Sequence, residues 1–199
     1  MVKPFLVKSK KIEGNIMTIS EIVMRCIGAL RIYINVIFKK RRIHISGIKQ
    51  YMGKNAHLRI SHKGMIDIGK ALYLSERSSL GAHDNGVLKI GDNNYFSSNI
   101  NVVCYLSIKI GDNNLFAQNV IILDHHHNYD SMETPICKQG FKYKPIEIGS
   151  DCWICANTVI CPGTYIGNHI VVSANSVVKG RLEKPGVYAG SPAKLIKER

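Results

Sequence analysis

The sequence predicts an all-β fold, a parallel β-helix built from six-residue units, and the period of its apolar residues is the main observation behind this. An aliphatic residue recurs at every sixth position near the end of the chain, at Ile148, Ile154, Ile160, Ile166, Val172 and Val178. The same frame occurs upstream, at Ile90, Phe96, Val102 and Ile108, and again at Ile110, Phe116 and Ile122. This period fits neither an α-helix, which repeats every 3.6 residues or so, nor a sandwich, whose turns fall about 8–12 residues apart.

The residues between these positions suit tight corners, which is the second observation. The triplet Ile-Gly-Asp occurs at 90–92 and 110–112, each time followed by Asn-Asn. Gly and Asn tolerate the positive φ that a tight corner needs. One unit is therefore a short strand plus a corner, and three units close a triangular coil whose stacked copies bury an aliphatic column. Between 40 and 90 the frame is interrupted, which predicts irregular coils or short insertions there.

The N-terminal segment, residues 1–42, differs from this pattern. Residues 18–38 are mostly apolar, with Arg25 and Arg31 spaced for one face of a helix, and four basic residues follow at 39–42. Charged residues interrupt the apolar run, so a transmembrane span is disfavoured. Two interpretations remain open: an amphipathic helix on an anionic membrane surface, and a helix packed on the base of the column.

Most of the net charge of +13 belongs to this end of the chain. Residues 1–63 hold 14 Lys and Arg against 2 Asp and Glu, a net of +12, whereas residues 64–199 hold 13 against 12. An electrostatic partner is therefore expected at the N-terminal end. Nucleic acid is not expected, because the basic segment has no interleaved aromatic residues and no nucleic-acid-binding motif. The six cysteines come without a cleavable signal sequence, which indicates free thiols in the cytoplasm.

Residues 43–199 are expected to form one β-helix domain with an excursion loop over 124–147. The repeat stops at Ile122 and resumes at Ile148, and a loop of this length is usually functional or disordered. Residues 179–199 carry Pro and Gly and are expected to form a short C-terminal cap.

The excursion opens with Asp124 and three consecutive histidines, His125 to His127. A neutral imidazole beside a carboxylate accepts a proton from a hydroxyl near neutral pH, which indicates a general base. Alternate histidines on an extended segment also suit a metal site, with a carboxylate as a further ligand. A third interpretation is a solvated loop without a chemical role. The residue types alone leave all three open.

Cys152 and Cys155 have the C-x-x-C spacing that elsewhere indicates zinc or redox chemistry. Both occupy small-residue positions of the repeat, and Cys161 takes the same position as Cys155. We therefore interpret them as core packing and predict no metal site. Trp153, the only Trp, is expected at a corner just after the loop, where it either packs or provides a flat wall for a ligand.

Together these features resemble the hexapeptide-repeat, left-handed β-helix acyltransferases, and within them the sugar O-acetyltransferases such as the galactoside, maltose, capsule and lipopolysaccharide enzymes. The resemblance covers roughly residues 64–199. It is carried by the segments IGDNNLFAQNVIILDHHHNYD, PIEIGSDCWICANTVICPGTYIGNHIVVSANSVV and GVYAGSPAKLIKER. The left-handed winding is implied by the resemblance alone, because the spacing contains no information on handedness and the usual crossover is right-handed.

The resemblance implies acetyl-CoA as the donor, a saccharide as the acceptor and a homotrimer with each active site between neighbouring columns. It implies that His125, directly after Asp124, takes the proton of the acceptor hydroxyl in a direct transfer without an acyl-enzyme intermediate. Relatives use an Asn or backbone N–H groups to stabilise the oxyanion. No secure match exists here, and the nearest aligned positions are Ser97 and Asn99.

The resemblance also implies the residues that bind the two substrates. Trp153 matches a Trp that walls the acceptor and thioester pocket, and His127 is a further expected acceptor contact. CoA lies along the groove between columns, and the matching positions are Ala156, Ala174, Lys179, Lys194 and Lys197. Lys194 and Lys197 replace arginines of the relatives, and Lys pairs with a phosphate as a point charge.

The sequence therefore predicts an acetyl-CoA-dependent O-acetyltransferase of surface polysaccharide or lipopolysaccharide. We expect it in the cytoplasm or at the inner face of the membrane, where a lipid-linked acceptor would be assembled. The alternatives are N-acetyltransfer to an amino sugar, O-acetyltransfer to an antibiotic, a metal-dependent β-helix enzyme and a non-catalytic binding module, since one fold serves many functions.

Overall fold

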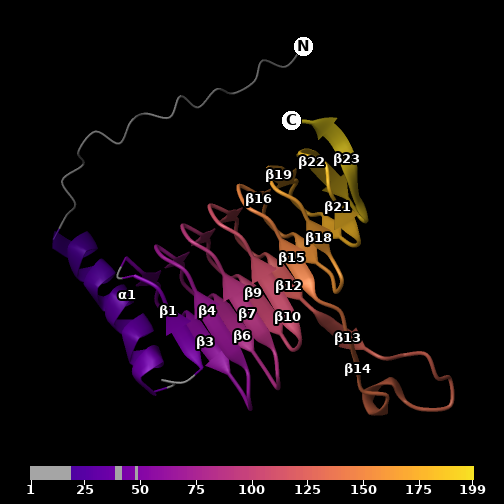
Figure 1. Cartoon of the computed structure of the whole chain (residues 1–199), viewed down its shortest axis with the longest axis horizontal. Coiled ribbons are helices and arrows are strands. Elements are labelled where there is room, and N and C mark those ends of the chain that lie inside the picture. The colour runs from indigo at the N-terminus through magenta and orange to yellow at the C-terminus, as the bar shows by residue number, and fades with distance from the viewer. Residues whose placement is uncertain (1–18, 39–41, 48) are drawn as a thin grey trace.

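A column of short parallel strands makes up most of the chain, and a helix lies across its first coil (Figure 1). The structure, a computed structural model, describes residues 19–38, 42–47 and 49–199. Its strands form three long sheets that run along the column, which confirms the all-β helix of hexapeptide repeats. The chain visits the three sheets in turn, and we name them face A, face B and face C in that order.

Each face is a ladder of strands from successive coils. Face A contains β1 (Ile43–Ile45), β4 (Met65–Ile68), β7 (Val87–Ile90), β10 (Ser107–Ile110), β15 (Ile146–Ile148), β18 (Tyr165–Ile166) and β21 (Arg181–Leu182). Face B contains β2 (Tyr51–Met52), β5 (Tyr73–Leu74), β8 (Tyr95–Phe96), β11 (Leu115–Phe116), β16 (Trp153–Ile154), β19 (Ile170–Val172), β22 (Gly186–Gly190) and β23 (Ala193–Glu198). Face C contains β3 (His57–Ile60), β6 (Ser79–Ala82), β9 (Asn101–Cys104), β12 (Ile121–Leu123), β17 (Val159–Ile160) and β20 (Val177–Val178).

The residues of the six-residue frame fill the interior of the column. All thirteen apolar residues that defined the frame are at most 4% exposed. Phe96 and Phe116 stack inside the column with their ring centroids 4.5 Å apart. Burying one such side chain contributes about 1.5–3 kcal/mol to the free energy of folding, so these thirteen residues are a major source of the stability of the column.

Asparagines hold the corners between faces B and C. Asn99, Asn119, Asn157 and Asn175 all have φ near +60°. Their side chains form a ladder in which the Nδ2 of Asn99 donates to the Oδ1 of Asn119 at 2.8 Å, and each later pair repeats the bond at 2.9 or 3.0 Å. Asn suits this corner because it adopts a left-handed backbone and also bonds its neighbours in the next coils.

The interruption of the frame before residue 90 takes the form of longer coils. Ile66 pairs with Leu88, 22 residues later, whereas Glu147 pairs with Tyr165, 18 residues later. The additional residues of the longer coils lengthen strands on faces C and A, since β6 and β7 have four residues each where β17 and β18 have two, and the strands stay in parallel register.

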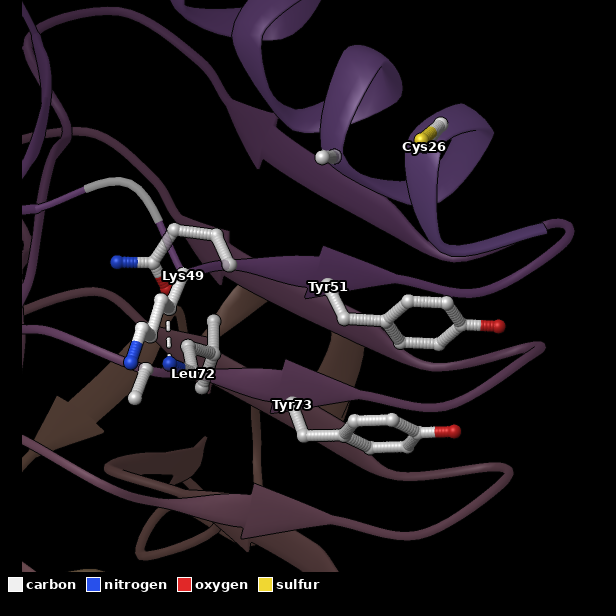
Figure 2. Close-up of a pocket in the computed structure, with 8 residues that line it drawn as sticks. Cys26, Lys49, Tyr51, Leu72 and Tyr73 are labelled. Atoms are coloured by element: carbon white, nitrogen blue, oxygen red, sulfur yellow. Dashed lines mark hydrogen bonds between the residues drawn. The ribbon is translucent and has the colours of Figure 1, made fainter. Parts of the chain in front are cut away.

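Helix α1 (Ile19–Phe38) packs one face on the first coil, where it contacts β1 and β2. Ile32 is fully buried and belongs to the core of the column. Gly28 allows the close approach, since a Cβ there would lie 2.7 Å from Cδ2 of Tyr51. Figure 2 shows the rings of Tyr51 and Tyr73 side by side near the helix, with centroids 4.4 Å apart, beside a hollow of about 570 Å³. The packing interpretation therefore applies to this face of the helix.

Two segments depart from the coils. After β12, the strands β13 (His125–His127) and β14 (Phe141–Tyr143) form an antiparallel hairpin with a short 3-10 helix, η1 (Ile136–Lys138), between them. Figure 1 shows this hairpin projecting from the column. At the C-terminal end, β22 and β23 pair antiparallel at the edge of face B. Across the ranges that the structure describes, no helix has both the length and the apolar character needed to cross a membrane.

Candidate functional site

Asp124 lies where the hairpin leaves the column, at the corner between face C and the next strand of face A, which we call the C–A corner. Its side chain is fully buried. The carboxylate accepts hydrogen bonds from the backbone N–H groups of Tyr105 at 2.9 Å, Leu106 at 2.8 Å and Ser107 at 2.9 Å. Three donors satisfy the buried oxygens, which fixes the position of the carboxylate. Burial, and next the charge of Asp124, raise the pKa of the Cys104 thiol beside it.

His125 is held against this carboxylate. Its Nδ1 lies 3.5 Å from Oδ1 of Asp124 and has no hydrogen-bond partner among the described residues. The ring packs edge-on against Tyr105, with centroids 4.5 Å apart, and lies 5.8 Å from the ring of Phe141. With Nδ1 turned inward to a carboxylate, Nε2 is left on the outward side of the ring, where a neutral imidazole is able to accept a proton.

Two residues that the sequence analysis did not assign to the site extend it along the C–A corner. The ring of Tyr105 lies between His125 and His83, whose centroid is 5.2 Å away. Nδ1 of His83 is 3.0 Å from the hydroxyl of Ser61. Burial lowers the pKa of His83, and the nearby Asp84 opposes that shift. The sequence signal that could have identified this row of side chains is the 22-residue spacing of Ser61, His83 and Tyr105, which is the length of one upstream coil.

A basic pocket of about 580 Å³ lies under the hairpin. His127, for which the sequence analysis predicts an acceptor contact, lines this pocket, and Lys179 from the corner that follows β20 lines it as well. Lys142 and Lys144, which the sequence analysis did not identify, add two more positive charges, and Lys142 pairs with Asp130. The pocket therefore suits an anionic group beside His127.

The other predicted residues lie elsewhere on the column. Trp153 was expected at a corner, and this was wrong: it lies within β16 on face B and is 50% exposed. It faces outward because its neighbour Ile154 occupies the inward position of the frame. The corner between faces B and C holds Ser97, Asn99, Ala156 and Ala174, and Lys194 and Lys197 lie on β23.

These placements divide the predicted site between two sides of the column. In a coil with three faces, each corner lies opposite the third face. The C–A corner with His125 is therefore opposite face B with Trp153, and the two side chains of one chain do not line one pocket.

The cysteines of the C-x-x-C pair lie in the wall of the column. Cys152 is buried, and its Sγ donates to the carbonyl oxygen of Gly167 at 3.1 Å. Burial raises the pKa of this thiol. Within the part of the chain that the structure describes, no group of three His, Cys, Asp or Glu side chains is placed to hold a metal ion.

Comparison with known proteins agrees with this architecture. Residues 145–180 match the family model described as bacterial transferase hexapeptide (six repeats). WbbJ of Escherichia coli K12, which is named for O-acetyl transfer in lipopolysaccharide biosynthesis, is 34% identical over 146 residues, covering 70% of this chain and 74% of WbbJ. The galactoside O-acetyltransferase of the same organism is 36% identical over 165 residues, 80% of this chain and 69% of that enzyme.

Two further comparisons are more limited. A Mycobacterium tuberculosis protein named as an acetyltransferase is 31% identical over 150 residues, but the chain spans only 50% of its length. Among solved structures, a mutant of the N-acyltransferase AntD from Bacillus cereus, in complex with dTDP-4-amino-4,6-dideoxyglucose and coenzyme A, gives a TM-score of 0.69. It covers 83% of this chain and 89% of its own at 22% identity, which shows the shared fold.

Proposed function

Because the chain belongs to the bacterial hexapeptide-repeat transferases, we propose that it is an acetyl-CoA-dependent O-acetyltransferase that modifies a saccharide hydroxyl. The pairing of a buried, backbone-bonded Asp124 with the inward Nδ1 of His125 carries the proposal. The names of WbbJ and of the galactoside enzyme support a saccharide acceptor, and WbbJ supports one from surface-polysaccharide assembly.

The proposed reaction is a direct transfer. Nε2 of His125 takes the proton of the acceptor hydroxyl while that oxygen attacks the thioester carbonyl of acetyl-CoA. Asp124 stabilises the imidazolium that forms, since its carboxylate lies on the other side of the ring. The tetrahedral intermediate collapses by breaking the carbon–sulfur bond, and the departing CoA thiolate takes the proton from His125. The products are the acetyl ester and free CoA.

Two features support CoA as the donor. Lys179, which the resemblance assigns to CoA, shares the basic pocket with Lys142 and Lys144, where an anionic group would be attracted. Ala156 and Ala174 present backbone and small side chains at the corner between faces B and C. We assign no oxyanion donor, because the Nδ2 of Asn99 already donates to Asn119 in the corner ladder.

We further propose that each active site is shared between copies of the chain, as in a homotrimer. His125 and Trp153 lie on opposite sides of one column, so they line a common acceptor pocket only when face B of one copy meets the C–A corner of another. Ser97 and Asn99 lie at the corner next to face B and would join the site from the same copy as Trp153.

The test is release of free CoA from acetyl-CoA across a panel of sugars, amino sugars and nucleotide sugars. The His125→Ala variant is expected to lose about 10²–10⁴-fold in rate, the effect of removing a general base. His62→Ala is the matched control, because His62 is an exposed histidine at the same corner three coils earlier. Full activity in His125→Ala would contradict the assigned base.

The product identifies the acceptor group. An acetyl ester is cleaved by mild base and an amide is not, so the same product distinguishes O-acetyltransfer from the alternative N-acetyltransfer. A reaction blank without acceptor is needed, because the chain's own six cysteines react with thiol reagents. An amide product would replace the proposed O-acetyltransferase by an amino-sugar N-acetyltransferase.

A further inference from the structure

Helix α1 has a second apolar face that no other described part of the chain covers. Five of its described side chains are between 37% and 58% exposed: Val23, Ile27, Leu30, Ile34 and Ile37. We call these five residues the outer stripe. An apolar row of this length on one helix is unusual on a protein surface and marks a site of interaction.

The outer stripe faces away from the column. Its residues follow at intervals of four and three, so at about 100° per residue they lie within one narrow face of the helix. Ile32, which is fully buried in the core, lies on the opposite side. Figure 1 shows α1 across the first-coil end of the column, so the stripe looks outward from that end.

Two occupants have the right apolar character: the same helix of a second copy, and a lipid surface. The spacing of the stripe matches coiled-coil core positions, but it spans only two heptads, and a coiled coil needs about three or four. The charge also argues against self-association. Residues 1–63 have a net charge of +12, which repels a second copy and attracts an anionic surface.

We propose that the outer stripe of α1 binds an anionic lipid bilayer, with the helix lying in the headgroup region and the column standing end-on above it. An apolar helix face within a basic segment is the combination that interfacial helices use. The basic residues 39–42 follow the helix directly in the sequence and add attraction at its C-terminal end. The membrane interpretation of the N-terminal segment thus belongs to the outer face of α1, and the packing interpretation belongs to its inner face.

The experiment measures co-sedimentation of the full chain with vesicles. One set contains phosphatidylcholine alone, and the other contains phosphatidylcholine and phosphatidylglycerol at about 2:1 to supply negative charge. Binding is expected only to the anionic vesicles and is expected to weaken as salt is raised. Equal binding to both vesicle types, or binding to neither, would overturn the proposal.

Substitutions then test the stripe itself. The double variant Leu30→Ser, Ile37→Ser removes its two most exposed side chains, each 58% exposed, without changing the charge. Vesicle binding is expected to fall at least about tenfold. The matched control is Met132→Ser, Ile196→Ser, which removes two apolar side chains that are 97% and 64% exposed elsewhere, and it should bind as the unmodified chain does.

Light scattering tests the other possible occupant of the stripe, the same helix of a second copy. If the double variant forms a smaller assembly while its vesicle binding is unchanged, the stripe is a self-association surface and the proposal is wrong. Acetyl transfer to a free saccharide does not involve the stripe, so it is expected to persist in the variant Leu30→Ser, Ile37→Ser. Stripe-dependent binding by a chain that transfers no acetyl group would reject the proposed function and leave this inference intact.

Discussion

The orientation of His125 depends on a carboxylate that the backbone holds in place. Three N–H groups of residues 105–107 fix Asp124, and Asp124 in turn faces Nδ1 of His125 across 3.5 Å. The buried carboxylate of Asp124 cannot be replaced by an amide without cost, because an amide would turn its own N–H group toward these backbone N–H groups.

Asp124→Asn is therefore expected to damage both stability and activity. The free energy of unfolding should fall by about 1–3 kcal/mol, from unsatisfied buried donors, and kcat should fall by about 10²–10⁴-fold, from a misoriented base. Urea denaturation and CoA release measure the two effects. Asp84→Asn removes the same charge from an exposed carboxylate at the same corner and should change neither. An Asp124→Asn enzyme with normal kcat would show that the carboxylate does not act through His125.

At the scale of the element, the period of six predicted the interior of the column because only inward positions repeat. Each of Ile148, Ile154 and Ile160 is buried, as are the other frame residues. It was harder to predict which residues of each six-residue unit lie in the strand and which lie in the corner, and Trp153 shows why. It precedes an inward isoleucine, so it lies within a strand, but strands of two residues leave few positions to distinguish a strand from a corner.

The sequence analysis did not predict that Ser61, His83 and Tyr105 form a row, for a related reason. These residues lie side by side only because the upstream coils are 22 residues long, and that length does not follow from the six-residue period. Winding sense likewise followed from the resemblance and not from the repeat, since a period is the same for either hand.

The attachment of α1 depends on the absence of a side chain at Gly28. Gly28→Val is expected to force the helix off Tyr51, whose ring is held by its stack on Tyr73, and to lower the free energy of unfolding by about 1–3 kcal/mol. Thermal unfolding and protease cleavage between α1 and the column report the loss. Cys26→Val adds the same branched side chain at an exposed position of the same helix and serves as the control. An unchanged midpoint in Gly28→Val would mean that the helix–column contact contributes little.

At the scale of the whole molecule, the opposition of His125 and Trp153 makes a prediction about mixed assemblies. His125→Ala and Trp153→Ala chains should each have low activity alone. When the two are unfolded together and refolded, about a quarter of the shared sites combine an intact His125 from one copy with an intact Trp153 from another, and activity should return. CoA release before and after mixing measures the recovery.

The control mixture pairs His125→Ala with Asp124→Asn. These residues lie at the same corner of one chain, so no arrangement of copies restores an intact pair, and activity should stay low. Absence of recovery in the first mixture, with assembly intact, would place the whole site within one chain and reject the shared site.

The regular spacing of the coils fixes the distance between α1 and His125 along the column. Along face C, β3 of the first coil is separated from β12, which leads into His125, by three steps through β6 and β9. Each step is about 4.8 Å and the helix is about 10 Å across, so with α1 in the headgroup region His125 would stand about 15–25 Å above the membrane surface, according to how deeply the helix is buried. If the acceptor is a lipid-linked glycan, a catalytic His125 at that height would miss the sugars next to the lipid and reach those farther out, so the length of a growing glycan would decide when it is acetylated.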